Sequence, residues 1–141
     1  MFLVDANVLS EATRPTPTPS VLAWLTQHES ELVLSPIVLG EIAYRIRLTP
    51  AGRKRTNLQR WFDGGVACLH VLNLDAGTAL AWAELLADLK RKGAAMPVKD
   101  SLIAASALQH GLTIATRNLQ DFEHSGVPLC NPFEILPEFR Q

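Results

Sequence analysis

The chain has 141 residues, of which 48% are hydrophobic and 19% are charged, and its formal net charge is −1 at pH 7. This composition excludes an intrinsically disordered protein, which combines low hydrophobicity with a high net charge. The two cysteines are too few for a disulfide-stabilised scaffold, and no apolar run reaches the roughly 18 residues of a membrane span. We expect one domain over residues 1–141 without a secretion signal, because Asp5 interrupts the apolar start, and hence a cytoplasmic protein.

Short runs of β-prone apolar residues alternate along the chain with longer segments of helical periodicity. In chain order, the predicted elements are a strand at 2–4, one or two helical turns at 6–12, a helix at 20–28, a strand at 32–34, helices at 35–48 and 53–63, a strand at 68–72, helices at 76–92 and 97–110, a strand at 112–115 and a short fifth strand near 128–129. Ser35 and Pro36 favour the start of one helix, and Gly93 favours the end of another. Residues 131–141 predict an irregular tail.

This alternation of strands and helices is typical of βαβ units. It predicts an α/β fold with a central parallel sheet of four to five strands flanked by helices. In sheets of this kind, ligands bind beyond the carboxyl ends of the strands. Polar residues that follow the predicted strands are therefore the first candidates for a functional site.

Two acidic residues follow predicted strands. Asp5 comes directly after the first strand, and Asp121 comes shortly after the fourth. A carboxylate at the end of a buried strand is costly to desolvate unless a partner compensates it. Each residue also has an ordinary explanation, because Asp5 can cap the helical turn that begins at Ala6 and acids are common in turns such as that at Asp121.

Two further acids lie on predicted helices. Glu41 lies on or beside the apolar face of the helix at 35–48, although an exposed ion pair with Arg45 would also explain it. Asp100 lies in the first turn of the helix at 97–110, where the helix dipole favours an acid. Its neighbours on that helix face are small and apolar, so the carboxylate could be held toward the interior.

The four acids indicate more together than singly. Two follow strands and two belong to helices that pack on the sheet, so all four could meet at one sheet edge. Four carboxylates within a few ångströms stay ionised only if a cation neutralises them. Carboxylate oxygens select Mg²⁺ or Mn²⁺ rather than zinc, and a carboxylate-bound Mg²⁺ is used mainly in phosphate chemistry.

Four segments carry a resemblance to a known family. They are LVDANVLSE at 3–11, SPIVLGEIAYRI at 35–46, VKDSLIAASALQHGLTIATRN at 98–118 and DFEHSGVPLCNPF at 121–133. In this order and spacing they resemble the PIN domain and, more narrowly, the VapC-type toxin ribonucleases of bacterial toxin–antitoxin pairs, in the FitB-like branch with a Ser-Glu pair after the first motif. The resemblance covers nearly the whole chain and is weakest between Arg47 and Leu74.

The resemblance implies a single PIN-like domain with a pocket of acids that bind Mg²⁺ or Mn²⁺. The family's acids match Asp5, Glu41, Asp100 and Asp121, and its polar residues match Asn7, Thr116 and Asn118. It implies a metal-dependent endoribonuclease that hydrolyses RNA phosphodiester bonds and leaves a 5′-phosphate and a 3′-hydroxyl. It also implies a homodimer held inactive by a small antitoxin, VapB-like, with a DNA-binding head and a tail that lies over the pocket.

An acidic pocket repels RNA, so we expect the RNA to be held by cations elsewhere. Almost half of the 13 basic side chains lie between residues 45 and 60, and such cations supply sequence-independent affinity for phosphates. The candidate RNA contacts are Arg117, Lys99, Arg45, Arg53, Lys54 and Arg55, with Arg117 preferred. A solvated helix face would also explain the group at 53–60. Trp61 and Phe62 are candidates for a partner surface, unless they pack in the core.

Two other functions are compatible with these residues. A PIN nuclease of RNA maturation would share the same site and differ only in lacking a toxin role. A receiver-like binding module also has a parallel sheet and an acidic pocket, but it needs a second acid beside the first strand and a lysine after the last one. Here Asp5 has no acidic neighbour before Glu11, and Arg117 follows Thr116.

Overall fold

The computed structural model describes residues 1–134, in which five parallel strands form one sheet. The strands are β1 (Phe2–Val4), β2 (Leu32–Leu34), β3 (His70–Val71), β4 (Thr113–Ala115) and β5 (Leu129–Cys130). Their order across the sheet is β3-β2-β1-β4-β5. In the central strand, Leu3 is in register with Val33 on one side and with Ile114 on the other. The predicted α/β class with a parallel sheet is confirmed.

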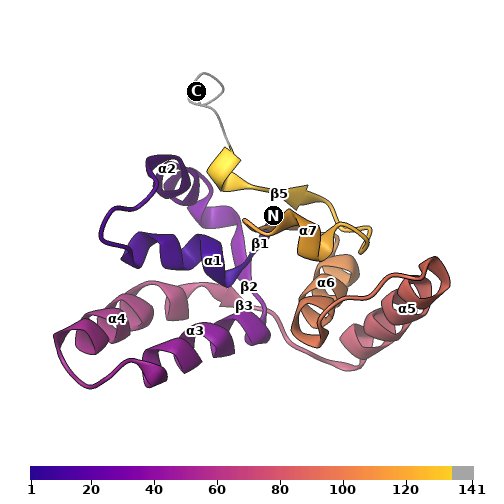
Figure 1. Ribbon diagram of the computed structural model, residues 1–141, viewed down its shortest axis with the longest axis horizontal. Helices are drawn as coiled ribbons and strands as arrows, with labels where there is room; N and C mark the ends of the chain where they lie inside the picture. Colours follow the sequence, from indigo (N-terminus) through magenta and orange to yellow (C-terminus); the bar gives the residue numbers. More distant parts are fainter. Residues whose placement is uncertain (135–141) are drawn as a thin grey trace.

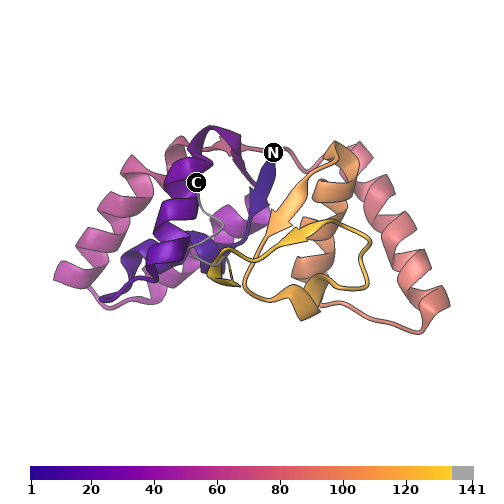
Figure 2. The same cartoon turned by 90° about the horizontal axis from the view of Figure 1, so that it is seen from above.

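Helices flank this sheet on two sides. The α-helices are α1 (Ala6–Leu9), α2 (Pro19–Gln27), α3 (Pro36–Leu48), α4 (Arg53–Gly64), α5 (Ala76–Lys92), α6 (Val98–His110) and α7 (Leu119–Phe122), and the 3₁₀ turns are η1 (Ser10–Thr13), η2 (Glu29–Glu31), η3 (Val66–Cys68) and η4 (Pro132–Glu134). Figures 1 and 2 show α3 and α4 on one side of the strands and α5 and α6 on the other. Within residues 1–134, no helix combines the length and the apolar character needed to cross a lipid bilayer.

Local signals set the ends of the long helices. The Ser35 hydroxyl accepts a hydrogen bond from the Ile37 backbone N–H at 3.1 Å, and Pro36 occupies the first helical position of α3. This is the start that the sequence predicts. Helix α5 ends at Gly93, whose φ of 67° lies in the left-handed region that glycine adopts without strain.

The structure differs from the prediction where elements are short. The predicted strand at 68–72 is reduced to His70–Val71, because residues Val66–Cys68 form a 3₁₀ turn instead. The turn predicted after β4 contains the short helix α7, which is anchored by Phe122 at 1% exposure. Four residues are too few for a helical period to be recognised in a sequence.

The strand order creates a switch point between β1 and β4. The chain moves from β1 outward to β2 and β3, and then returns to place β4 on the other side of β1. Ligands of open α/β sheets bind beyond the carboxyl ends of the strands at such a point. The order also excludes the receiver-like module, whose sheet runs 2-1-3-4-5.

Candidate active site

Asp5 lies at the switch point, directly after β1. Its backbone N–H donates to the carbonyl of Ala115 at the end of β4, at 2.9 Å, and the residue is only 9% exposed. Oδ1 accepts from the Ala6 backbone N–H at 2.8 Å, which is the helix cap that the sequence allowed. Oδ2 accepts from the Thr116 hydroxyl at 2.8 Å and from the Asn7 amide at 3.3 Å. Asp5 therefore caps α1 with one oxygen and joins the end of β4 with the other.

Polar residues after β4 hold this arrangement in place. Thr116 is fully buried, and its hydroxyl accepts the Asn118 backbone N–H at 3.0 Å while donating to Asp5. The Asn7 side-chain oxygen accepts the Arg117 backbone N–H at 3.0 Å. Asn118 contacts this network through its backbone N–H, and Thr116 orients the Asp5 carboxylate because its single hydroxyl proton is directed there.

Glu41 reaches the same region from α3. Its side chain is 19% exposed, and its carboxylate lies 3.7 Å from the Lys99 ammonium of α6. The ion pair with Arg45 that would have explained Glu41 as a surface residue is absent among the residues that the model covers. Lys99, a predicted RNA contact, is therefore placed beside an acid of the pocket.

Asp100 shows that the four acids share one electrostatic environment. Burial, followed by the negative charges of Asp5, Asp121 and Glu41, raises the pKa of Asp100 to about 6, although Lys99 opposes the effect. The helix dipole at the start of α6 would by itself lower the pKa of Asp100. Desolvation and carboxylate repulsion outweigh it, so Asp100 is not explained as a simple helix-start acid.

Asp121 is the most open of the four acids. It lies on α7 and is exposed, and its charge reaches Asp100. Helix α7 packs against α6, which accounts for this proximity. Asp5, Glu41 and Asp121 are therefore all near enough to Asp100 to act on its pKa, and Asp5 lies at the carboxyl end of β1.

The donor set fits a hard divalent cation. Within residues 1–134, no three His, Cys, Asp or Glu side chains lie close enough together to coordinate one metal ion as they stand. The charges of three carboxylates nevertheless raise the pKa of Asp100, so the acids are near enough to interact electrostatically. Mg²⁺ keeps several of its waters and needs direct bonds to only one or two carboxylates, so a looser ring of oxygen donors suits it. That these four residues bind metal remains a prediction.

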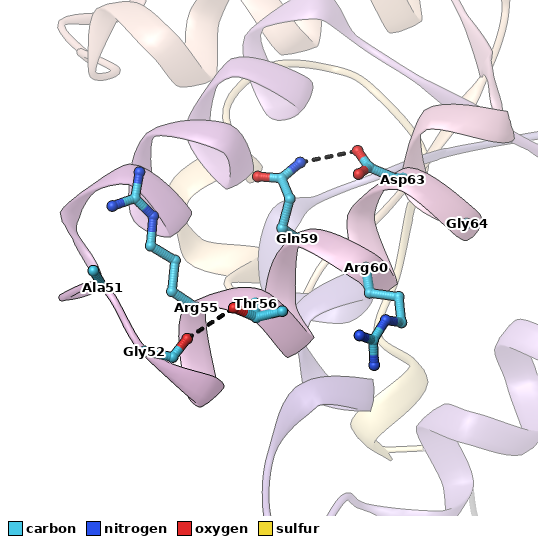
Figure 3. A pocket seen from close by; sticks show the side chains of 8 residues that line it. All are labelled: Ala51, Gly52, Arg55, Thr56, Gln59, Arg60, Asp63 and Gly64. Atoms are coloured by element: carbon cyan, nitrogen blue, oxygen red, sulfur yellow. Dashed lines mark hydrogen bonds between the residues drawn. The ribbon is translucent and has the colours of Figure 1, made fainter.

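The predicted RNA-contact residues fall into separate places. Three of them, Arg117, Arg45 and Lys54, line one hollow of about 750 Å³, which Asn7 also lines and which we call the α3–α4 groove. Arg53 lines a smaller hollow of about 420 Å³ that shares Lys54 and Trp61 with it. Arg55 lies on another flank of α4 (Figure 3). Arg53, Lys54 and Arg55 are neighbours in sequence but lie on different faces of α4.

Glu11 is a polar site residue that was not among the predicted ones. It is 4% exposed, and its carboxylate accepts both the backbone N–H and the hydroxyl of Thr18 at 2.8 Å. These bonds, the backbone one above all, hold the pKa of Glu11 below its ordinary value despite burial, and the charges of Arg14 and Arg117 act in the same direction. In the sequence, only the Ser-Glu pair at 10–11, which follows the first motif, pointed to Glu11.

Comparison with known proteins agrees with this architecture. A family model described as the PIN domain matches residues 2–126. "VapC ribonuclease Y4jK" of Sinorhizobium fredii is 36% identical over 138 residues, which cover 95% of this chain and 99% of the relative. "Toxin FitB" of Neisseria gonorrhoeae is 34% identical over 137 residues, which cover 94% and 99% of the two chains.

A solved structure agrees as well. The one described as "Structure of FitAB bound to IR36 DNA fragment" superposes with a TM-score of 0.89 at 31% identity, and covers 96% of this chain and 98% of that chain. The family model and both relatives span most of the chain, and strands β1 to β4 with the acids after β1 and β4 lie within the residues that the family model matches. The chain belongs to the PIN domain family.

Proposed function

We propose that the protein is a divalent-metal-dependent endoribonuclease that hydrolyses RNA phosphodiester bonds and acts as the toxin of a type II toxin–antitoxin pair. The observation that carries this proposal is the hydrogen-bonded Asp5 carboxylate at the switch point, whose charge, with those of Glu41 and Asp121, acts on Asp100. The names of the relatives, a VapC ribonuclease and the toxin FitB, support both the activity and the role.

In this proposal the four acids, Asp5, Glu41, Asp100 and Asp121, hold Mg²⁺ or Mn²⁺. When bound, the cation supplies Lewis acidity toward the scissile phosphate and lowers the pKa of a water molecule. Thr116 and Asn7 hold the Asp5 carboxylate in one orientation through their hydrogen bonds. Asp100 must release its proton before it can contribute a charge, which its pKa of about 6 allows at neutral pH. Attack by water in line with the leaving 3′-oxygen leaves a 5′-phosphate and a 3′-hydroxyl.

The proposed partner is a small, DNA-binding antitoxin. A structural relative is described as FitAB bound to a DNA fragment, which supports a two-protein complex of this kind. By the resemblance, the antitoxin is VapB-like, its tail covers the acidic pocket, and the toxin forms a homodimer. We propose the cytoplasm as its location, where RNA of the cell would be its substrate.

The test is RNA cleavage by purified protein freed of antitoxin. Wild type with Mg²⁺ or Mn²⁺ is expected to cleave a 5′-labelled RNA, EDTA to abolish cleavage, and Asp5→Asn to reduce it by at least about 100-fold. Asp63→Asn is a matched control, because Asp63 lies on the exposed flank of α4 and makes its hydrogen bond with Gln59. Equal cleavage by Asp5→Asn, or in EDTA, would refute the metal-dependent nuclease. Expression that leaves bacterial growth unaffected would refute the toxin role alone.

A further inference from the structure

The α3–α4 groove adjoins the acidic pocket directly. Asn7 lines the groove and also donates to Asp5 Oδ2, and Arg117 lines it next to Thr116. From this border the groove extends along η1, α3 and α4, and Figure 1 shows α3 and α4 side by side. A chain that leaves the groove past Asn7 would therefore meet Asp5 next.

The charges that face the α3–α4 groove are mostly positive. Four cations line it, namely Arg14, Arg45, Lys54 and Arg117. The acid among its lining residues is Glu11, which is 4% exposed, has Thr18 as its hydrogen-bond donor and lies 3.8 Å from Arg14. The groove therefore presents an excess of positive charge to a ligand, which suits a chain of phosphates.

Arg117 is held at the border between the groove and the pocket. Its backbone N–H donates to Asn7, and its guanidinium carbon lies 4.7 Å from the ring centroid of Phe133. A cation over an aromatic face is stabilised by the ring quadrupole. Phe133 therefore positions the one groove cation that lies closest in sequence to Thr116.

The floor of the groove is apolar and includes an aromatic ring. Ile42 and Ile46 are almost fully buried beneath it, and Leu58 and Trp61 of α4 are partly buried in its wall. Cations that track the backbone, combined with an aromatic side chain on which a base can stack, are the recognition chemistry of single-stranded nucleic acid. Duplex RNA keeps its bases stacked inside and would not use the aromatic ring.

We propose that the α3–α4 groove is the path along which a single-stranded segment of the substrate RNA reaches the acidic pocket. The phosphates lie against Arg45, Lys54 and Arg117, and one base stacks on Trp61. This assignment rests on the proposed function and deepens it, because it selects a single-stranded substrate and three of the six candidate contact residues. The groove could also suit a protein segment rich in acids, and the experiment below distinguishes the two.

The opposite flank of α4 supplies matched controls. Figure 3 shows Arg55 and Arg60 there, beside Gln59 and Asp63, whose side chains are hydrogen-bonded at 2.9 Å. All residues that line this flank belong to the single segment 51–64, so it is the open side of one helix. None of the four acids lines it. Removing Arg55 or Arg60 changes the net charge as much as removing Lys54 does, but on the face of α4 that does not line the α3–α4 groove.

The test measures RNA binding separately from cleavage. A 5′-fluorescein single-stranded RNA of 12 nucleotides is titrated with Asp5→Asn protein, and Kd is followed by anisotropy as the salt is raised from 50 mM. On that background, Lys54→Ala and Arg45→Ala are each expected to reduce the slope of log Kd against log salt by about 0.7. If the variant and its parent bind equally at 1 M salt, this change in slope makes the variant bind about eightfold more weakly at 50 mM salt. Arg55→Ala and Arg60→Ala are expected to leave the slope unchanged.

Trp61→Leu tests the stacking step. It is expected to weaken binding by at least about fivefold without changing the salt slope, since it removes a ring and no charge. Circular dichroism checks that this variant folds, and a duplex RNA of the same sequence is expected to bind wild type and Trp61→Leu equally. Equal losses for the variants on both flanks of α4 would overturn the proposal, whatever the cleavage assay shows. So would unchanged RNA affinity in the groove variants, and weaker binding of the cognate antitoxin by the same variants would then assign the groove to a protein.

Discussion

Asp100→Asn is expected to stabilise the metal-free protein while removing its function. Burial and the charges of Asp5, Asp121 and Glu41 raise the pKa of this carboxyl from 3.8 to about 6. The folded state therefore holds the Asp100 proton to a higher pH than the unfolded state does. Between pH 3.8 and about 6 the folded state binds more protons, so the free energy of unfolding falls as the pH rises. Above about pH 6 the whole penalty is present.

The size of the effect follows from the pKa change and the exposure of the side chain. A rise from 3.8 to about 6 corresponds to about 3 kcal/mol for a fully shielded group. Asp100 is only half-buried, so solvent screening reduces this to about 1–2 kcal/mol. For a domain of this size, that change shifts Tm by about 3–8 °C.

The assay is thermal unfolding in EDTA from pH 4 to pH 8. Asp100→Asn is expected to unfold at a higher temperature than wild type at pH 7.5, and the difference is expected to vanish toward pH 4. Saturating Mg²⁺ or Mn²⁺ is expected to raise the Tm of wild type, because it binds the folded state, and to leave that of Asp100→Asn nearly unchanged. Asp63→Asn, on the exposed flank of α4, serves as the control and is expected to follow wild type. A lower Tm for Asp100→Asn than for wild type in EDTA at pH 7.5 would refute the reasoning.

Three further predictions concern the residues around the site. Thr116→Val removes the shortest hydrogen bond to Asp5 Oδ2 and the acceptor of the Asn118 N–H, although Ala6 and Asn7 still donate to the Asp5 carboxylate, so urea unfolding is expected to show a loss of about 1–3 kcal/mol and RNA cleavage a loss of about tenfold or more, with Thr116→Ser retaining both; cleavage by Thr116→Val at the wild-type rate would contradict the positioning role. Wild type is expected to lose stability as the pH falls below 4.5, because the lowered pKa of Glu11 stabilises the fold only while the carboxyl is ionised, and Glu11→Gln is expected to flatten that dependence in urea titrations; an unchanged pH dependence would count against it. Phe133→Leu is expected to weaken RNA binding by about 2- to 5-fold in anisotropy measurements but to add nothing to Arg117→Ala, whereas additive losses would show that Phe133 acts independently of Arg117.

Much of the fold was predictable because strong local signals coincide with its elements. The cap at Ser35 and the left-handed Gly93 set the ends of α3 and α5 where the pattern indicated. The position of Asp5 was predictable as well, since an apolar run that ends in an acid must become a buried strand with its carboxylate at the end. Helix α7 and the shortened β3 were not predictable, because elements of four and two residues depend on the packing around them.

The acids of the candidate site could be predicted from the sequence, but the residues that lie beside them could not. Asp5 and Asp121 follow strands that the topology makes neighbours, but the partner of Glu41 is Lys99, which lies far away in sequence. The helical wheel places Lys54 with Leu58 and Trp61 at spacings of four and seven. Only the packing of α3 and η1 against that face shows that it borders the acidic pocket. A net charge of −1 conceals this separation of acids from cations.

Direct measurement of Mn²⁺ binding tests whether Asp5, Glu41, Asp100 and Asp121 form a metal site or are four acids without a shared ligand. Electron paramagnetic resonance of Mn²⁺ titrated into purified protein counts the free ion at each step. Wild type and Asp63→Asn are expected to bind Mn²⁺ alike, and Asp5→Asn and Asp100→Asn are expected to weaken binding by at least about tenfold. Equal Mn²⁺ affinity in all four proteins would contradict a metal centre built on the carboxylates at the ends of β1 and β4.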